Sequence, residues 1–425
     1  MKQIFSREEL SEIFEKKIGV DVYGICLDSK NVKDGDIFVA LCGEKVDGHD
    51  FIHEACTNGA ALIISERAIY NIPDDRLVLS DSSYDSLLKL AKFNINRATH
   101  TKYICVTGSV GKTTTKNMLF HILNAEFGKN IYASQKNFNS KIGLTVCAAL
   151  MPRDTEIAIF EMGMSAAGNI RYLTEIIRPD IAIITNVYPV HLEFFDSVLG
   201  IAKAKSEILE RSPDYAIIPY NSPYSEFLRK KAADCEVKNI IRFGRNENYD
   251  ALELNATAAI TAANIATGID AQRFFDHLKS FSQDSNRGGI KYLKNGSIVL
   301  IDDSYNASPP SLKSAIKALV KFENMRKILV MGDMKELGDD QKYFHENLSP
   351  AIDKYNIDLV FACGELSKYM YDNLRECKRG AWESDADKIA EHVLAEMKNG
   401  DCVLVKGSRS MKMEIVANAI LEKTS

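Results

Sequence analysis

Short runs of consecutive apolar residues alternate with helix-like segments along most of the chain. Residues 103–107, 155–162 and 179–186 form runs long enough for buried strands, and the segments between such runs repeat apolar positions every three or four residues. Strands that alternate with helices need crossover connections, which place the strands parallel to one another in one sheet. The pattern therefore predicts an α/β fold.

The arrangement of apolar runs and helix-like segments changes twice along the chain, which divides it into three predicted domains. Residues 1–83 read as a small α/β domain, 84–286 as a central parallel-sheet domain, and 287–425 as a doubly wound, Rossmann-like domain. The second boundary lies at NRGG (286–289), where glycines and polar residues cluster as they do in linkers. The length of 425 residues agrees with this division, since a domain holds roughly 150 residues.

Composition and charge exclude several classes of protein. The chain has 53 Lys and Arg against 58 Asp and Glu, a formal charge of −5, and 46% of its residues are hydrophobic. These values are ordinary for a globular protein and argue against disorder, a fibre or a general nucleic-acid binder. A small anionic substrate remains compatible, because one basic pocket can lie on an acidic protein.

The cysteines and the N-terminal segment bear on the cellular location. Nine scattered cysteines include no C-x-x-C pair, which argues against a disulfide framework or a zinc site. The first residues are charged throughout, unlike a signal peptide, and no apolar run reaches the roughly 18 residues of a membrane span. We therefore expect a protein of the reducing cytoplasm, without a membrane span.

The strongest chemical signal is TGSVGKTTTK (107–116), which stands between a predicted strand and a predicted helix. Glycines let backbone N–H groups wrap phosphate oxygens, and the helix that follows adds the positive end of its dipole. In such a loop Lys112 can reach the outer phosphates of a nucleotide, and Thr113 can bind Mg²⁺. Val106 stands where the longer motif has glycine, so a turn before a surface helix is the alternative interpretation.

Three further residues could support a metal-bound nucleotide. Glu161 ends an apolar strand, at the edge of the sheet where doubly wound folds bind their ligands. His191 follows another strand, and Lys205 lies on a predicted helix. Taken singly, each has an ordinary alternative: a solvated carboxylate, a loop histidine and a charged helix face.

Taken together, these segments resemble the Mur ligase family, whose members use ATP to join an amino compound to a growing peptidoglycan precursor. The resemblance rests on motifs that follow one another in family order: TGSVGKTT (107–114), FEMG (160–163), TN…HLEFF (185–195) and AKSEI (204–208). Further segments are similar to the member that adds D-alanyl-D-alanine to UDP-N-acetylmuramoyl-tripeptide: residues 28–52, 301–312, 330–338 and 403–414.

The resemblance implies contacts to ATP and to Mg²⁺, with two ions expected. The implied ATP contacts are Gly108, Ser109, Val110, Gly111, Lys112, Thr113, Thr114, Asn255, Arg287, Asp302, Tyr305 and Asn306. The implied metal ligands are Thr113, Glu161, His191 and Lys205, and the implied catalytic residues are Lys112, Glu161, His191 and Lys205. Carbamylation of Lys205 by CO₂ is also implied, since it would turn a cation into an oxygen donor for the metal.

The resemblance also implies the substrate contacts, and with them the partners. The residues expected near the UDP-sugar are Asp28, Ser29, Asp47 and His49, with Asn139 in a substrate-facing segment and Lys406, Ser408 and Arg409 at the peptide or D-alanyl-D-alanine end. Tight turns, strand ends and helix starts are the structural alternatives for these residues. The implied partners are the two substrates, with no nucleic acid, and we expect a monomer.

The expected reaction forms an amide bond through an acyl phosphate, and we expect an open apo form with NRGG as its hinge. Only residues 245–254 precede NATAA (255–259), where the family has a longer β-rich stretch, so we expect a shortened central domain. Two alternatives stay open. One is another Mur-type or folylpolyglutamate-type amino acid ligase, and the other is a nucleotide-binding regulator that has lost catalysis.

Overall fold

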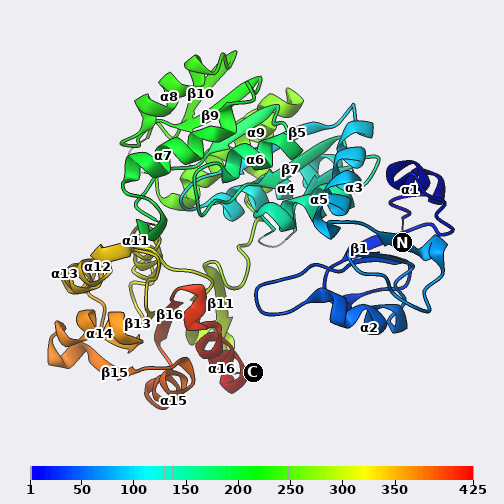
Figure 1. Ribbon diagram of the computed structural model, residues 1–425. Coiled ribbons are helices and arrows are strands. Elements are labelled where there is room, and N and C mark those ends of the chain that lie inside the picture. The colour runs from blue at the N-terminus through cyan, green and yellow to red at the C-terminus, as the bar shows by residue number, and fades with distance from the viewer. Residues whose placement is uncertain (1, 129, 136–137, 191, 247–248, 425) are drawn as a thin grey trace.

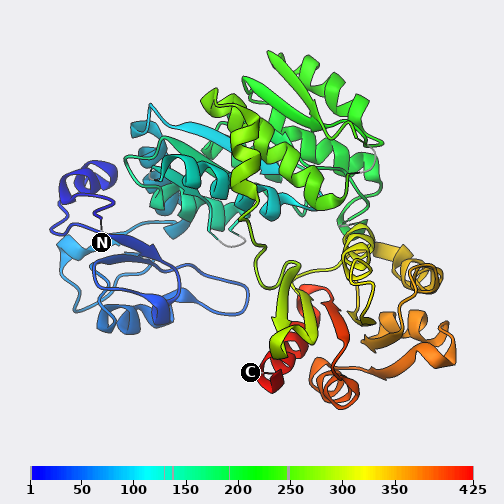
Figure 2. The same cartoon turned by 180° about the vertical axis from the view of Figure 1, so that it is seen from behind.

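Three sheets, each with its own helices, follow one another along the chain (Figure 1). The computed structural model describes residues 2–128, 130–135, 138–190, 192–246 and 249–424. Among the described residues, every pair of neighbouring strands is parallel except β11 with β12, so the predicted α/β class is confirmed. Figures 1 and 2 place the first and third sheets on the same side of the central one.

The N-terminal sheet has four strands in the order β1-β2-β3-β4. Its strands are β1 (Gly24–Cys26), β2 (Asp36–Val39), β3 (Leu62–Ser65) and β4 (Leu77–Leu79). Its helices are α1 (Arg7–Phe14), α2 (Ile52–Thr57) and the 3₁₀ turns η1 (Ser29–Asn31), η2 (Gly48–Phe51) and η3 (Asp74–Arg76). Phe38 of β2 packs towards α2, whereas Ile37 and Val39 face the core that continues into the central domain.

The central sheet has six strands in the order β10-β9-β8-β5-β7-β6. Its strands are β5 (Lys102–Thr107), β6 (Ile131–Ala133), β7 (Ile157–Glu161), β8 (Ile181–Ile184), β9 (Tyr215–Pro219) and β10 (Asn239–Phe243). Its helices are α3 (Ser83–Arg97), α4 (Lys112–Phe127), α5 (Lys141–Leu150), α6 (Asn169–Ile176), η4 (Leu192–Phe194), α7 (Val198–Ser206), η5 (Glu207–Leu209), α8 (Ser225–Asp234), α9 (Ala251–Thr267) and α10 (Ala271–Leu278).

Helices cover both faces of the central sheet. Ile104 and Val106 of β5 face α4 and α9, while Tyr103 and Cys105 face the opposite core with α3 and α5. A strand that is buried on both faces reads as a continuous apolar run, which is why the sequence predicts β5. The carboxyl ends of β5, β7 and β8 consequently meet at one edge of the sheet.

The C-terminal sheet has the order β11-β12-β16-β13-β14-β15, and its strand β11 is antiparallel to β12. Its strands are β11 (Gly289–Leu293), β12 (Ile298–Asp303), β13 (Arg326–Gly332), β14 (Leu359–Cys363), β15 (Arg379–Glu383) and β16 (Asp401–Lys406). Its helices are η6 (Lys294–Gly296), α11 (Pro309–Leu319), η7 (Gly338–Asp340), α12 (Gln341–Glu346), α13 (Ser349–Lys354), α14 (Glu365–Asp372), η8 (Glu376–Lys378), α15 (Ala386–Glu396), η9 (Arg409–Met411) and α16 (Glu414–Thr424).

Two details of the C-terminal domain differ from the sequence pattern. The apolar spacing over residues 340–355 is that of a single helix, but the segment forms two short helices, because Pro350 has no N–H to donate and fits only the first turn of α13. The edge strand β11 is antiparallel, so the sheet is mixed. Val299 and Ile301 pack on one face of the sheet and Leu300 on the other, as a doubly wound domain requires.

Two further observations concern the whole chain. None of the described helices is both long enough and apolar enough to cross a membrane. All nine cysteines are free thiols, and Cys105, Cys363 and Cys402 are buried in their strands as small apolar side chains.

Candidate functional site

The loop between β5 and α4 adopts a backbone that needs glycine at two positions. Gly108 has a φ of +150° and Gly111, at the N-terminus of α4, a φ of +82°. A Cβ atom on Gly108 would lie 1.9 Å from Thr185 Oγ1, and one on Gly111 would lie 2.4 Å from Asn255 Oδ1. The loop is therefore closely surrounded, and it brings Asn255 of α9 against the start of α4.

The segment after β8 braces this loop. Asn186 Oδ1 accepts a hydrogen bond from Val110 N (2.9 Å), and Asn186 Nδ2 donates one to Val110 O (3.0 Å). Ser109 Oγ donates to Tyr188 O (3.0 Å) and accepts from Tyr188 N (2.8 Å). Sequence reasoning missed these supporting roles, although polar residues directly after a buried strand were a usable signal.

Lys112 curls back over the loop. Its Nζ donates hydrogen bonds to Gly108 O (2.8 Å) and Ser109 O (3.2 Å). Burial lowers the pKa of Lys112, whereas the nearby carboxylate of Glu161 opposes this shift. The ammonium group of Lys112 thus lies beside the loop backbone to which an anion would bind.

Glu161 is the centre of a small polar cluster at the carboxyl end of β7. Its side chain is buried, and Oε2 accepts a hydrogen bond from Thr113 Oγ1 (2.7 Å) while Oε1 accepts one from Asn139 Nδ2 (2.7 Å). The structure therefore brings together three residues that the sequence placed far apart. A carboxylate beside a hydroxyl suits Mg²⁺, which often takes only one or two protein ligands and completes its shell with water and phosphate.

Lys205 is only 2% exposed, near the C-terminal end of α7. The structure records no hydrogen bond or ion pair between its amine and any described residue. Burial, and then the charge of Lys112, holds the pKa of Lys205 well below its usual range. His191 lies outside the described residues, and no group of three His, Cys, Asp or Glu side chains suited to a metal occurs within the described part.

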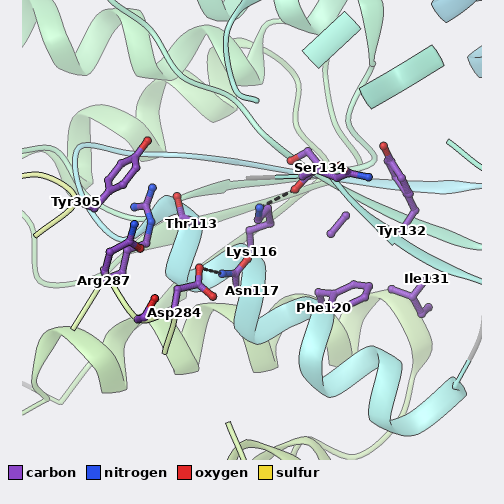
Figure 3. Close-up of a pocket in the computed structure, with 14 residues that line it drawn as sticks. Thr113, Lys116, Asn117, Phe120, Ile131, Tyr132, Ser134, Asp284, Arg287 and Tyr305 are labelled. Atoms are coloured by element: carbon purple, nitrogen blue, oxygen red, sulfur yellow. Dashed lines mark hydrogen bonds between the residues drawn. The ribbon is translucent and has the colours of Figure 1, made fainter. Parts of the chain in front are cut away.

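Arg287 and Tyr305 close the site from the side of the C-terminal domain. The guanidinium carbon of Arg287 lies 3.8 Å from the centre of the Tyr305 ring, and that of Arg409 lies 5.6 Å from the same centre. Figure 3 shows Arg287 and Tyr305 beside Thr113, at one end of a cavity. Arg287 also contributes to the lowered pKa of Lys112, as expected of a neighbouring positive charge.

The remaining candidates of the C-terminal domain are held by local contacts. Burial raises the pKa of Asp302, whose Oδ1 accepts a hydrogen bond from Ser304 Oγ (2.6 Å). Lys406 is buried and donates to Asp303 Oδ2 (2.6 Å) and to the carbonyl oxygen of Asn306 (2.9 Å). The ammonium of Lys406 is therefore already neutralised inside the protein.

The last two candidates of this domain differ in their accessibility. Ser408 is buried, and its Oγ accepts a hydrogen bond from Lys335 N (2.8 Å). The Arg409 side chain is exposed and pairs with Glu414 (2.9 Å). Of Lys406, Ser408 and Arg409, only Arg409 reaches the surface with its charged group.

The four candidates of the N-terminal domain stabilise two 3₁₀ turns. Asp28 caps η1, and Ser29 donates a short hydrogen bond to Glu54. Asp47 caps η2 and accepts from His49 Nδ1 (2.6 Å), while His49 Nε2 accepts from the backbone N–H of residue 66 (3.0 Å). Both ring nitrogens of His49 are thus engaged within the domain, and the role of these residues in sugar binding stays a prediction.

A glycine-rich phosphate loop, an acid on the neighbouring strand and three α/β domains define a P-loop nucleotide-binding protein with several domains. Residues 21–87 match the catalytic domain of the Mur ligase family, residues 106–283 the Mur ligase middle domain, and residues 290–409 the Mur ligase glutamate ligase domain. The chain belongs to the Mur ligase family.

Relatives and solved structures agree along the full length. The UDP-N-acetylmuramoyl-tripeptide–D-alanyl-D-alanine ligase of Rickettsia prowazekii is 32% identical, with 92% of this chain and 93% of that protein covered. The crystal structure of the MurF ligase from Thermotoga maritima in complex with ADP is 32% identical and covers 95% of this chain and 99% of its own, with a TM-score of 0.77.

A third comparison concerns the fold alone. The UDP-N-acetylmuramoylalanyl-D-glutamyl-2,6-diaminopimelate–D-alanyl-D-alanyl ligase from Acinetobacter baumannii is 24% identical. The match covers 98% of each chain with a TM-score of 0.84. All three sheets therefore have counterparts in a solved ligase.

Proposed function

We propose that this protein is the ATP-dependent ligase that adds D-alanyl-D-alanine to UDP-N-acetylmuramoyl-tripeptide, in the cytoplasmic synthesis of peptidoglycan precursors for the cell wall. The observation that carries the proposal is the cluster of Thr113, Asn139 and Glu161 directly beside the phosphate loop. The full-length similarity to ligases of that activity, at about one third identity, supports the choice of substrates.

The loop and its lysine would stabilise the charge that moves during phosphoryl transfer. A peptide carboxylate is a poor electrophile, and transfer of the γ-phosphoryl group to it makes an acyl phosphate with a good leaving group. The backbone N–H groups of residues 108–113 and the ammonium of Lys112 would hold the phosphates in place, since such catalysis is mainly positioning and electrostatics. The dipeptide amine then attacks the acyl carbon, and phosphate leaves.

Mg²⁺ would be held by Thr113 and Glu161, whose oxygens already lie 2.7 Å apart. When bound, the ion neutralises phosphate charge and orients the oxygens. Asn139 keeps the Glu161 carboxylate in place through its other oxygen. His191 and a carbamylated Lys205 would serve a second ion, and the buried, weakly basic amine of Lys205 suits carbamylation because only an unprotonated amine attacks CO₂.

The third domain would supply the amine side of the reaction. Arg287 and Arg409 both lie close to the ring of Tyr305, and their guanidinium groups would donate hydrogen bonds to an anion, either a phosphate or the dipeptide carboxylate. Lys406, paired with Asp303, would position the loop of Asn306 rather than bind the substrate directly. Asp302, Tyr305 and Asn306 remain the proposed nucleotide contacts of this domain, and Asn255 that of α9.

The deciding experiment is a coupled phosphate-release assay with UDP-N-acetylmuramoyl-tripeptide, ATP and different amine acceptors. We expect turnover with D-alanyl-D-alanine and none with single amino acids or with folate substrates. The Lys112→Ala variant should lose turnover by about 100-fold or more, the size of effect that follows loss of one group stabilising transition-state charge. Activity with a single amino acid alone would assign another ligase, and no turnover with any acceptor would favour a regulator.

A further inference from the structure

Lys116 is a buried cation one turn further along α4 than Thr113, and it has no part in the proposed mechanism. The residue is only 3% exposed, and its Nζ donates a hydrogen bond to Ser134 O (2.7 Å), which Figure 3 draws as a dashed line. Residues three apart lie on the same face of a helix, so Lys116 and Thr113 point the same way from α4. Burial of a charge is unfavourable, so a lysine at this position needs a physical reason.

Ser134 lies between Lys116 and Glu161. Its carbonyl oxygen accepts the hydrogen bond from Lys116, while its Oγ accepts one from the backbone N–H of Glu161 (3.1 Å). The carboxylate of Glu161 is itself held by Thr113 and Asn139. The ammonium group of Lys116 is therefore fixed close to the carboxylate that would bind Mg²⁺, with one residue connecting the two.

More positive than negative groups act on this place. Burial lowers the pKa of both Lys112 and Lys116, and the negative charge of Glu161 opposes the shift in each case. Arg287 lowers both pKa values further, as a third cation nearby. The exposed carboxylate of Asp284 raises the pKa of Lys116 and is the weakest of these influences. Glu161 is thus a buried carboxylate among several cations.

We infer that Lys116 sets the order in which metal and nucleotide bind: its fixed positive charge disfavours a divalent cation beside Thr113 and Glu161 until the nucleotide phosphates are there. The inference rests on the proposed function, which places Mg²⁺ and the phosphates at these residues. A divalent cation that arrives alone meets the repulsion of Lys112, Lys116 and Arg287. A nucleotide brings several negative charges, which the same cations attract, and the metal then binds between the phosphates and Glu161.

Two properties suit Lys116 to this task better than a surface lysine. Because Lys116 is buried, its field is screened less by salt than the field of an exposed charge. Its bond to Ser134 O keeps the ammonium group at one place, so the repulsion is the same in every molecule. The interaction also grows with the product of the charges, so a divalent ion feels it twice as strongly as a monovalent one.

The test measures three affinities of the purified protein. They are those for Mn²⁺ alone, a paramagnetic probe of the Mg²⁺ site, for ADP in EDTA, and for ADP with saturating Mg²⁺. Lys116→Met removes the charge and keeps most of the side-chain volume. We expect this variant to bind Mn²⁺ alone about 5- to 30-fold more tightly and ADP in EDTA about 3- to 10-fold more weakly. ADP with saturating Mg²⁺ should change by less than about 3-fold, because the two effects oppose each other.

Four further variants complete the design. Lys116→Gln is a second neutral variant and should give the same signs, should the methionine variant fail to fold. Lys116→Arg keeps the charge, has room because residue 116 lines a cavity of ≈ 800 Å³, and should restore the weak binding of Mn²⁺ alone. Lys279→Met removes an exposed lysine from α10, which packs against α4, and should leave all three affinities unchanged. Mn²⁺ that Glu161→Gln still binds is subtracted as binding elsewhere on the chain.

The opposite signs for metal and nucleotide distinguish this role from a structural one. Weaker binding of all three ligands by both neutral variants would show that Lys116 only supports the local fold. Weaker binding of ADP with unchanged binding of Mn²⁺ would make Lys116 a phosphate contact. Either result would overturn the inference. Failure of the wild-type protein to bind Mn²⁺ even with ADP present would instead overturn the metal site of the proposed function.

Discussion

Lys205 stands in surroundings that disfavour its own charge. A lysine among Lys203, Glu207 and Glu210 reads in the sequence as part of a solvated helix face, yet Lys205 is buried and Lys203 is exposed. Its pKa is held well below the usual range by burial and by Lys112. A folded chain that keeps this amine unprotonated must release a proton that the unfolded chain would bind, so folding and pH are linked at this residue.

We predict that Lys205→Met stabilises the protein in CO₂-depleted buffer while it removes ligase activity. The unfolded lysine binds a proton below a pKa of about 10.4, and the buried one does so only at lower pH. Between these two pKa values the wild-type protein loses stability as the pH falls, by about 1.4 kcal/mol per unit relative to the variant. Urea denaturation at several pH values measures this difference.

The matched control for this prediction is Lys203→Met, which replaces an exposed lysine on the same helix. It should show neither the pH-dependent gain in stability nor the loss of turnover. A stability difference between wild type and Lys205→Met that stays constant with pH would contradict the argument from burial.

The sequence predicts the position of some site residues but not the contacts of others. The glycines and Lys112 of the phosphate loop follow from local spacing, because the loop is one continuous segment. The bond from Asn139 to Glu161 and the buried pair of Lys406 with Asp303 depend on which strands become neighbours, and no local pattern records that. From the sequence, Lys406 is therefore interpreted as a free cation near the start of a helix, although in the structure Asp303 neutralises its charge.

The junction of β5 and α4 is the element on which the nucleotide site depends. At the start of α4, Gly111 combines a left-handed backbone with a position where a Cβ atom would clash with Asn255. At the end of the same helix, Gly128 has a φ of +67°, but a Cβ atom there would meet nothing within 4 Å. Both positions require a positive φ, but only at Gly111 is there also no space for a Cβ atom.

We predict that Gly128→Ala costs about 1 to 2 kcal/mol of stability, the penalty of a left-handed backbone for a residue with a Cβ, and leaves ADP binding unchanged. Gly111→Ala should cost more and should weaken ADP binding, because its Cβ displaces Asn255. Adding Asn255→Ala to Gly111→Ala should recover part of the stability. Urea denaturation and ADP titration calorimetry measure both effects, and equal penalties at the two glycines would contradict the proposed clash.

The elements that the sequence pattern missed share a position in their sheets. The patterns predict the central strands, such as β5, β7 and β8, but not β6, β10, β11 or β15, which are the outer strands of the second and third sheets. An edge strand has one neighbour and is partly exposed, so it lacks the continuous apolar run of a strand buried on both faces. The prediction was thus strongest where the core is and weakest at the edges.

At the scale of the whole molecule, the hydrophobic cores do not divide as the three sheets do. One core contains Phe5 and Val39 from the first domain together with Cys105 and Phe160 from the second, with α3 between them. The two cores of the C-terminal domain contain none of the described residues from outside it. The first two domains are therefore expected to behave as one rigid unit.

We predict that scanning calorimetry resolves two unfolding transitions rather than three. ADP should raise mainly the unfolding temperature of the first two domains, because the phosphate loop belongs to them. At an ADP concentration of 100 times Kd, their free energy of unfolding should increase by about 2.7 kcal/mol. Three separate transitions would show that the shared core does not couple the first two domains. A shift confined to the C-terminal transition would place the main nucleotide contacts in the third domain.

The linker before β11 is then the place where the molecule can bend. Lys321, two residues after α11, and Asp250, the N-cap of α9, form an ion pair across the boundary (3.1 Å). Lys321 is exposed and Asp250 partly exposed, and such surface pairs contribute little. Closure of the third domain on the other two would bring Arg287 and Arg409 towards bound anions and exclude water from the acyl phosphate.

Two exposed cysteines of the chain allow this closure to be measured with fluorescent dyes. Cys42 in the first domain and Cys377 in the third are exposed, whereas the other seven cysteines are buried or partly buried. We predict that energy transfer between dyes on Cys42 and Cys377 increases when a non-hydrolysable ATP analogue, the sugar-tripeptide and D-alanyl-D-alanine are added together. Lys112→Ala, which cannot hold the phosphates, should show a smaller change at the same concentrations. Cys377→Ser supplies the donor-only baseline, and transfer efficiency unchanged by saturating ligands would show that the third domain does not close.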